Sequence, residues 1–248
     1  MSIRFFLILL TSFMFSYEVG DQLSYYDVLK QYPICYGSEE HGFGSDGMLS
    51  FSDFNGSSSD FHVFFIDLAA SWWGPCWNSI GTMSDIEELY YDHDNVLIFT
   101  NLDDIGQPYS CEDWGNRGLQ FGGYPLITDD GPGSDLWGKF NTGSAFPSTV
   151  YIDHTMTVHY KANNPSLVIA QNMIDQMLDK LYSSLLLSAN FAIDFNGDTD
   201  NDGLMNPGDS FDVIINVMNK SYSDDNSAVN VNLELTSDCN DLTITSSN

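Results

Sequence analysis

Basic residues are scarce in this sequence of 248 residues: 7 lysines and arginines stand against 35 aspartates and glutamates. The formal net charge at pH 7 is −28, and acidic residues predominate in both halves of the chain. A field of this sign repels a phosphate backbone, which argues against a nucleic-acid partner. Acids at this density suit a salty, cation-rich exterior, although solvation of the surface accounts for most of them.

Long hydrophobic runs are also scarce, and the one at the N-terminus is short. It extends from Phe5 to Phe15 and follows Met-Ser-Ile-Arg. Such a run spans a bilayer poorly but has the length of the apolar part of a secretory signal peptide. We therefore expect a signal peptide over residues 1–16, export to the periplasm, the cell surface or the exterior, and no transmembrane span after cleavage. A buried N-terminal strand is the alternative interpretation.

Cysteine occurs only four times, at Cys35, Cys76, Cys111 and Cys239. Disulfides form and persist in exported proteins, so pairing of these residues is expected. Four cysteines allow three complete pairings, and the sequence does not choose among them.

The hydrophobic pattern divides the chain into parts. Residues 17–46 show no sustained period and are interpreted as a lead-in segment, whereas strands and helices alternate over 47–187. In chain order we expect a strand and turn over 49–56, strands over 61–69 and 96–101, helices over 76–91 and from 110, strands over 126–128, 147–153 and 155–161, and a helix over 165–187. This order predicts an α/β domain with a mixed central sheet flanked by helices.

From residue 188 onward the composition changes to Asp, Asn, Ser and β-branched residues. Apolar and polar residues alternate over 211–217 and 229–235, as in half-buried strands, and 242–245 is a third candidate. Three strands cannot close a β-sandwich of about seven. We therefore expect residues 188–248 to be the start of an all-β, Ig-like sandwich that continues beyond Asn248.

Three segments carry a specific resemblance. The residues from Asp67 to Cys76, Asp-Leu-Ala-Ala-Ser-Trp-Trp-Gly-Pro-Cys, resemble the thioredoxin active site, in which Trp-Cys-Gly-Pro-Cys opens a helix. Residues 49–56 are similar to the lead-in of TlpA-like and redoxin proteins, and residues 146–153 resemble the family's cis-proline strand. Residues 47–187 are thus identified as a thioredoxin-like (TlpA/redoxin) domain. The resemblance implies a thioredoxin-like fold and no cofactor.

The resemblance also implies the site residues. Asp67 matches the buried acid that moves a proton to or from the second cysteine, although an ordinary strand-end carboxylate is an equal alternative. Pro147 matches the cis-proline, and Cys76 matches the resolving cysteine. Trp73 occupies the position of the attacking cysteine, so two-cysteine exchange at this site is excluded. Cys111 should open a helix at the same sheet edge and could pair with Cys76, the alternative being two separate thiols.

Two functions are compatible with these residues. The first is an exported thiol-disulfide oxidoreductase of the redoxin class, impaired by Trp73, whose partners are exported protein thiols or disulfides. The second is a non-catalytic extracellular binding or adhesion protein that uses the fold as a scaffold for a peptide partner. Fold alone does not decide function, but the family resemblance favours the first as the class label.

An acidic loop near the start of the second part has the spacing of a calcium site. Residues 198–209 place acids at positions 1, 3, 5 and 12 and glycine at position 6. Oxygens at this spacing converge on a hard cation. Strands rather than helices follow, so the loop resembles the opening of Ig-like modules in secreted bacterial proteins, and a solvated acidic linker is the alternative. The expected ligands are Asp198, Asp200, Asp202, the Leu204 carbonyl and Asp209.

We predict that calcium binds this loop and orders the start of the Ig-like part, because a divalent ion offsets the repulsion among carboxylates. Calorimetry of a chain extended to the end of the module should detect binding at millimolar calcium and weaker binding of magnesium. Asp198→Ala and Asp202→Ala should each reduce binding and lower the melting temperature. Unchanged binding and melting in both variants would make the loop an acidic linker.

Overall fold

A computed structural model describes residues 16–43, 47–56, 60–131, 135–143, 145–184, 186–197 and 210–222. The chain divides into two compact units, Met1–Asp179 and Lys180–Asn248, which are described separately. The expected signal segment up to residue 15, the loop 198–209, the strands 229–235 and 242–245, and Cys239 lie outside the described residues. Within the described ranges no helix is both long and apolar enough to cross a membrane.

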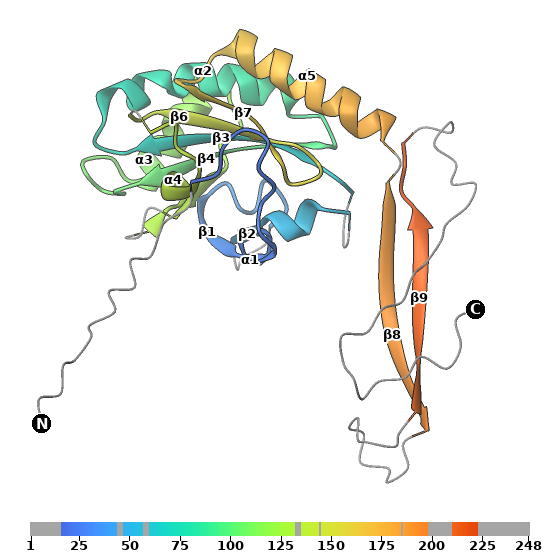
Figure 1. The fold of residues 1–248 in the computed structure, drawn as a ribbon. Helices are drawn as coiled ribbons and strands as arrows, with labels where there is room; N and C mark the ends of the chain where they lie inside the picture. Colours follow the sequence, from blue (N-terminus) through green and yellow to red (C-terminus); the bar gives the residue numbers. More distant parts are fainter. Residues whose placement is uncertain are drawn as a thin grey trace, which may run out of the picture. The chain divides into compact units, whose positions relative to one another are not determined.

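The first unit is built on a seven-stranded mixed sheet (Figure 1). Its strands, in spatial order, are β2 (Met48–Ser50), β1 (Gln31–Tyr36), β5 (Ile127–Asp129), β4 (Val96–Asp103), β3 (Val63–Ala70), β6 (Ser148–Ile152) and β7 (Val158–Asn163). The three strands β5, β4 and β3 are parallel, and β6 and β7 continue the sheet antiparallel. The predicted mixed α/β architecture is confirmed, and the order of its elements fits a thioredoxin-like fold.

Strand β3 is the centre of the sheet and is buried along its whole length. Because successive side chains of a strand face opposite sides, β3 contributes to two apolar clusters. Phe64, Ile66 and Leu68 lie in one cluster, and Ala69 lies in the other. Burying a side chain such as Phe64 stabilises the fold by roughly 1.5–3 kcal/mol. The buried strand therefore fixes where its two ends lie, and one of these ends leads into the candidate site.

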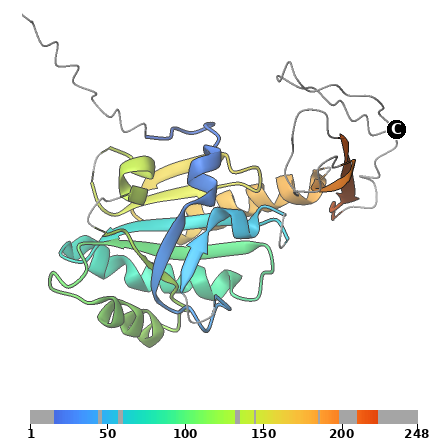
Figure 2. The same cartoon turned by 90° about the horizontal axis from the view of Figure 1, so that it is seen from below.

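Helices cover the two faces of the sheet (Figures 1 and 2). The short α1 (Tyr25–Leu29), the 3-10 helix η1 (Phe51–Phe54) and α4 (Asp135–Phe140) contribute to the cluster that contains Phe64. The long α2 (Gly74–Tyr90) and α3 (Cys111–Gln120) contribute to the cluster that contains Ala69. Helix α5 (Leu167–Ser183) lies beside α2, since the Tyr90 hydroxyl donates to the Asp175 carboxylate at 2.8 Å.

The segment interpreted as a lead-in, residues 17–46, is instead part of the sheet. It contains α1 and β1, and β1 pairs antiparallel with both β2 and β5. The sequence signal is weak here because β1 is short and contains Pro33, a residue that argues against a strand inside a sheet. Only Tyr32 of this strand is fully buried. The first unit therefore begins well before residue 47.

The described part of the second unit is a two-stranded antiparallel sheet of β8 (Leu187–Gly197) and β9 (Ser210–Asn219). The strand predicted over 211–217 is confirmed, because it lies inside β9. The long β8 was not expected, although Phe191, Ile193 and Phe195 stand at alternate positions within residues 188–197. An Ig-like sandwich needs more strands than these two.

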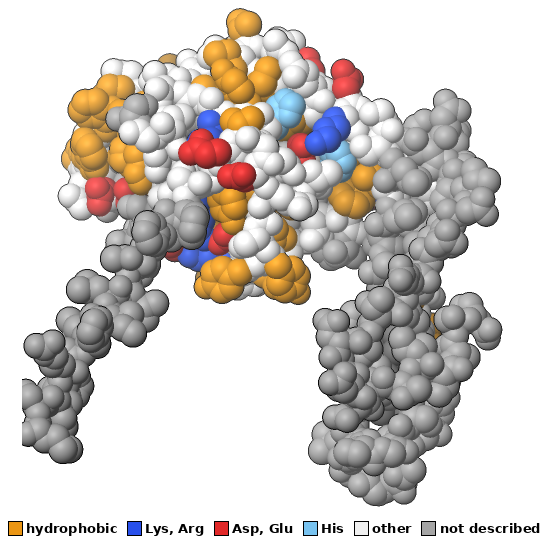
Figure 3. Space-filling model, in the orientation of Figure 1, with side chains coloured by type: hydrophobic (Ala, Val, Ile, Leu, Met, Phe, Trp, Pro, Cys, Tyr) orange, Lys and Arg blue, Asp and Glu red, His pale blue; other side chains and the backbone are white. Residues whose placement is uncertain are grey.

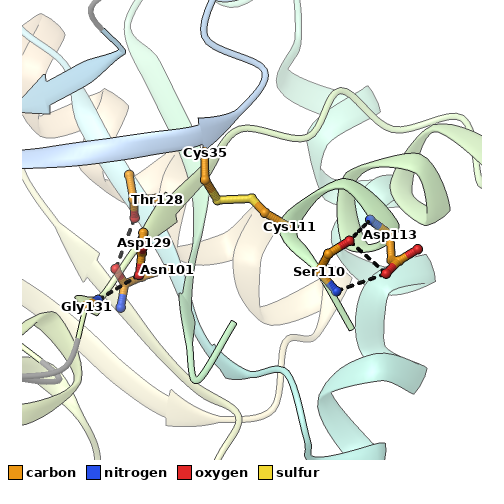
Figure 4. The surroundings of a disulfide bond; sticks show 8 residues. All are labelled: Cys35, Asn101, Ser110, Cys111, Asp113, Thr128, Asp129 and Gly131. Carbon is orange, nitrogen blue, oxygen red and sulfur yellow. Dashed lines mark hydrogen bonds between the residues drawn. A yellow bond between two sulfur atoms is a disulfide. The ribbon is translucent and has the colours of Figure 1, made fainter. Parts of the chain in front are cut away.

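Strand β1 is fastened to α3 by a covalent bond and by a close packing contact. Cys35 of β1 forms a disulfide with Cys111, the first residue of α3 (Figure 4). The Tyr36 ring lies against Gly115 of α3 so closely that a Cβ at this glycine would be 2.4 Å from a ring carbon. The Tyr36 hydroxyl also donates to the Asn116 side chain at 3.2 Å.

We predict that Gly115→Ala destabilises the protein by about 1–3 kcal/mol, because the added methyl group must displace the Tyr36 ring. Gly81→Ala is the matched control: it also lies inside a helix, and its Cβ would be 3.6 Å from the Phe121 ring, an ordinary contact. The control should gain about 0.5–1 kcal/mol from the better helix former. Urea denaturation measures both changes, and equal effects of the two substitutions would contradict the packing argument.

Candidate functional site

The candidate site lies where β3 ends and α2 begins. Trp73 is the N-cap residue of α2, and Gly74 and Pro75 form its first turn. Proline suits this position because the first amides of a helix have no partner within it and its fixed backbone angle is already helical. The Trp73 carbonyl accepts the amide hydrogens of Cys76 at 3.0 Å and Trp77 at 3.2 Å, which closes the turn.

Cys76 is a buried thiol with no accessible surface, and it forms no disulfide. Burial raises the pKa of this thiol to about 12, and the nearby Asp67 adds to the rise. A backbone hydrogen bond with Ala70 acts in the opposite direction but does not overcome burial. The thiolate is the nucleophilic form of cysteine, so Cys76 is a protonated and unreactive thiol near neutral pH.

Asp67 is a buried carboxyl on the same side of β3 as Ala69. It is 1% exposed, and its Oδ1 oxygen has no hydrogen-bond partner among the described residues. Burial raises its pKa to about 8, and the charge of Glu87 contributes to the rise. Glu87 of α2 is itself buried, which raises its pKa to about 7, although its carboxylate accepts the Tyr124 amide at 2.9 Å. Two buried carboxyl groups therefore have raised pKa values, Asp67 on β3 and Glu87 in the last turn of α2.

Trp73 links α2 to the segment that precedes β6. Its indole nitrogen donates to the Phe146 carbonyl at 2.8 Å, and the Phe146–Pro147 peptide bond is cis. The side chain still exposes 39% of its surface. Next to it, the Trp72 indole donates to the Asp104 carboxylate at 2.8 Å and exposes 49%. Two tryptophans thus form the rim of the site, where the family pattern has one tryptophan followed by a cysteine.

The structure brings four of the predicted site residues to this end of the sheet. Trp73 contacts the residue before Pro147, and Phe146 packs against the cluster that contains Cys76. Asp67 acts electrostatically on Cys76. The predicted cis bond at Pro147 is confirmed.

Cys111 does not pair with Cys76, although a disulfide between them was one of the two alternatives considered from the sequence. It lies in the same apolar cluster as Cys76, but its sulfur is bonded to Cys35 (Figure 4). The reason is the position of β1, which places Cys35 beside the start of α3 with a Cα–Cα distance of 6.1 Å, within the usual range for a disulfide. Ser110 caps the helix there, accepting the Asp113 amide at 3.0 Å.

Two residues of the site were not predicted from the sequence. Glu87 is one of them, and its spacing gave a usable signal: it follows Ile80 by seven residues and Met83 by four, so it belongs to the buried face of α2. Phe146 is the other, and nothing in the sequence indicates that its carbonyl accepts the Trp73 indole. Among the described residues no group of three or more His, Cys, Asp or Glu could hold a metal ion.

The sequence matches no protein-family model, and no curated protein matches it. Solved structures resemble its fold. A Chlorobium tepidum thiol:disulfide interchange protein, DsbE, is 19% identical over 66% of this chain and 98% of its own, with a TM-score of 0.41. A secreted disulfide oxidoreductase of Mycobacterium tuberculosis is 11% identical over 62% of this chain and 99% of its own, with a TM-score of 0.45.

A third similar structure is a secreted thiol-disulfide isomerase of Corynebacterium glutamicum. It is 12% identical over 72% of this chain and 98% of its own, with a TM-score of 0.46. Likeness at these identities concerns the fold, so the chemistry of the site rests on its own geometry.

We predict that Asp67 makes the folded state less stable as the pH rises. Its raised pKa means that the native state favours the protonated carboxyl, so the stability from this group is full below about pH 4 and is lost toward pH 8. Asp67→Asn removes the titration. The difference in unfolding free energy between the variant and the parent should grow with pH, by at most about 1.4 kcal/mol per pH unit.

Urea denaturation between pH 4 and pH 9 measures this difference. Asp85→Asn is the control, because it makes the same substitution at an exposed position of α2. A constant difference for Asp67→Asn across the range would show that Asp67 is ionised in the native state at all of these pH values.

Proposed function

We propose that this chain is an exported thioredoxin-fold protein of the thiol-disulfide oxidoreductase class that is impaired in dithiol exchange at the start of α2. The observation that carries the proposal is Trp73 at the N-cap of α2, held by its hydrogen bond to Phe146, above the buried thiol of Cys76. The cis peptide before Pro147 and the buried Asp67 support membership of this class.

Exchange chemistry explains the impairment. An exposed thiolate must first attack the substrate disulfide, and a second thiol then resolves the mixed disulfide. Trp73 has no sulfur to form the first bond. Cys76 has no accessible surface and a pKa near 12, so it cannot take over the attack. Cys76 therefore keeps the surroundings of a resolving cysteine, but no attacking cysteine is present to form the mixed disulfide that it would resolve.

Export is supported by the Cys35–Cys111 disulfide. Such bonds persist in oxidising compartments and are rare in the cytosol. The signal peptide expected over residues 1–16 also supports export. We therefore place the protein in the periplasm, at the cell surface or outside the cell.

The exposed tryptophans favour a second candidate, a non-catalytic binding protein. Trp72 and Trp73 are near neighbours, with ring centroids 5.6 Å apart, and Trp72 also lies 6.2 Å from Phe146. Tryptophans that offer both apolar surface and fixed geometry are common anchors of protein interfaces. In this candidate the rim binds a peptide partner, and the second unit is an Ig-like spacer stiffened by calcium.

We predict that the parent protein does not catalyse reduction of insulin disulfides by dithiothreitol and that Trp73→Cys gains measurable activity. The substitution restores a cysteine at the helix N-terminus, where unpaired amides stabilise a thiolate, and places it three residues before Cys76. Turbidity of insulin over time measures the rate, and mass spectrometry after alkylation shows whether residues 73 and 76 form a disulfide.

Two variants serve as controls. Trp73→Ser removes the indole without adding a thiol, and Trp72→Cys adds a thiol one position away from the helix cap. Both should stay inactive. Equal and appreciable activity in the parent and in Trp73→Cys would show that another cysteine does the work. An inactive Trp73→Cys that nevertheless forms the 73–76 disulfide would leave the binding protein as the better proposal.

A further inference from the structure

A hollow lies away from the candidate site, between the end of β1 and the ends of α2 and α3. It has a volume of about 120 Å³, comparable with the roughly 150 Å³ cavity that binds benzene in an engineered lysozyme. The residues that line it and matter here are Tyr36, Glu40, His41, Tyr91, Leu119 and Tyr124. Tyr91, Leu119 and Tyr124 are 48%, 53% and 38% exposed, so the hollow is open to solvent.

The walls of this hollow are held in place by contacts of their own. The Tyr91 and Tyr124 rings are stacked, with centroids 3.5 Å apart. The backbone of Tyr124 is held from two sides, by the Glu87 carboxylate at 2.9 Å from its amide and by the His41 ring at 3.0 Å from its carbonyl. Gly37 lies so close to the Pro125 carbonyl that a side chain would not fit there. The hollow is therefore formed before any ligand arrives.

Among the described residues that line the hollow, the charged side chain is the carboxylate of Glu40. Burial lowers the pKa of His41 below its usual value, so its ring is neutral at pH 7. Because a carbonyl can only accept, the Nε2–H of His41 donates to Tyr124, and Nδ1 is left as an acceptor. The Glu40 carboxylate is close enough to act electrostatically on both Tyr36 and His41. No lysine or arginine is among the described residues that line the hollow.

The lining also has three tyrosine rings, from Tyr36, Tyr91 and Tyr124. Tyr91 and Tyr124 stack on each other, so each of these two rings leaves one face for a ligand. Aromatic rings attract cations, and cages of such rings recognise quaternary ammonium groups. The net charge of −28 repels anions from the whole surface, and acidic side chains lie among exposed hydrophobic patches on the face drawn in Figure 3. A neutral apolar ligand would fill the volume of the hollow but would not interact with the charge of Glu40.

We propose that this hollow binds a small organic cation of the alkylammonium class, with its charged group against the tyrosine rings and near Glu40. The site is separate from Trp73 and Cys76, and it does not depend on the function proposed for them. Its ligand class follows from the joint presence of aromatic walls, a carboxylate at the rim and a preformed volume.

Choline chloride is the probe for the full chain, titrated by calorimetry at pH 7.5 with sodium chloride added to keep the ionic strength constant. Choline should bind at millimolar concentration with one site per chain. Its uncharged carbon analogue, 3,3-dimethylbutanol, has the same shape and should bind about threefold to thirtyfold more weakly, which is the range expected for a cation on aromatic rings.

Variants locate the site. Tyr91→Leu keeps an apolar wall but removes an aromatic ring, and Glu40→Gln removes the rim charge from an exposed residue without affecting folding. Each should weaken choline binding at least threefold. Tyr25→Leu is the matched control, because Tyr25 is an exposed tyrosine on α1, away from the hollow, and its loss should leave binding unchanged.

Three results would overturn the proposal. Equal binding of choline and 3,3-dimethylbutanol would make the hollow an apolar site only. Equal loss of binding in Tyr91→Leu and Tyr25→Leu would mean that cations gather diffusely on an acidic surface. No heat of binding with 100 mM choline would show that the hollow has no useful affinity for this class.

Discussion

Strand β3 is buried along its whole length, and this burial sets the conditions at the candidate site. A strand with both faces covered must be apolar almost throughout, and Asp67 is the exception in β3. The same burial that stabilises the sheet withholds water from this carboxyl and from the Cys76 thiol above it, and both then favour their protonated forms. The chemistry of the site is therefore set by packing before any substrate is considered.

Trp73 changes what this environment can do. In the arrangement that the sequence resembles, a helix N-terminus activates an exposed sulfur and a buried acid serves a second one. Here the helix N-terminus, the buried acid and the second sulfur are present, but an indole closes the position of the first. Its hydrogen bond to Phe146 joins two backbone segments that approach each other at this edge. The end of the sheet therefore carries an aromatic rim where the arrangement that the sequence resembles has an exposed sulfur.

Much of this could be predicted from the sequence because the signals are local. The run that becomes β3, the proline in the first turn of α2 and the segment around Pro147 each carry their own pattern, and they give the mixed sheet and four of the site residues. The rest depends on contacts between distant segments. Strand β1 is short and contains Pro33, so neither its place in the sheet nor the pairing of Cys35 with Cys111 has a local signal. The burial of Glu87 could be predicted from its spacing along α2, whereas the hydrogen-bond partner of the Trp73 indole could not be predicted.

The Cys35–Cys111 bond closes a covalent ring in the chain, with a sequence separation of 76 residues between its ends. A ring of this size stabilises the fold by roughly 4 kcal/mol through the entropy of the unfolded chain. It also contains β2, β3, α2 and β4, and hence Asp67, Trp73 and Cys76. A single proteolytic cut within the ring would leave both fragments attached to each other. A pulling force applied to the two ends of the chain would pass through the disulfide and leave the enclosed residues unextended. This part of the molecule therefore stays joined after a single cut and resists stretching.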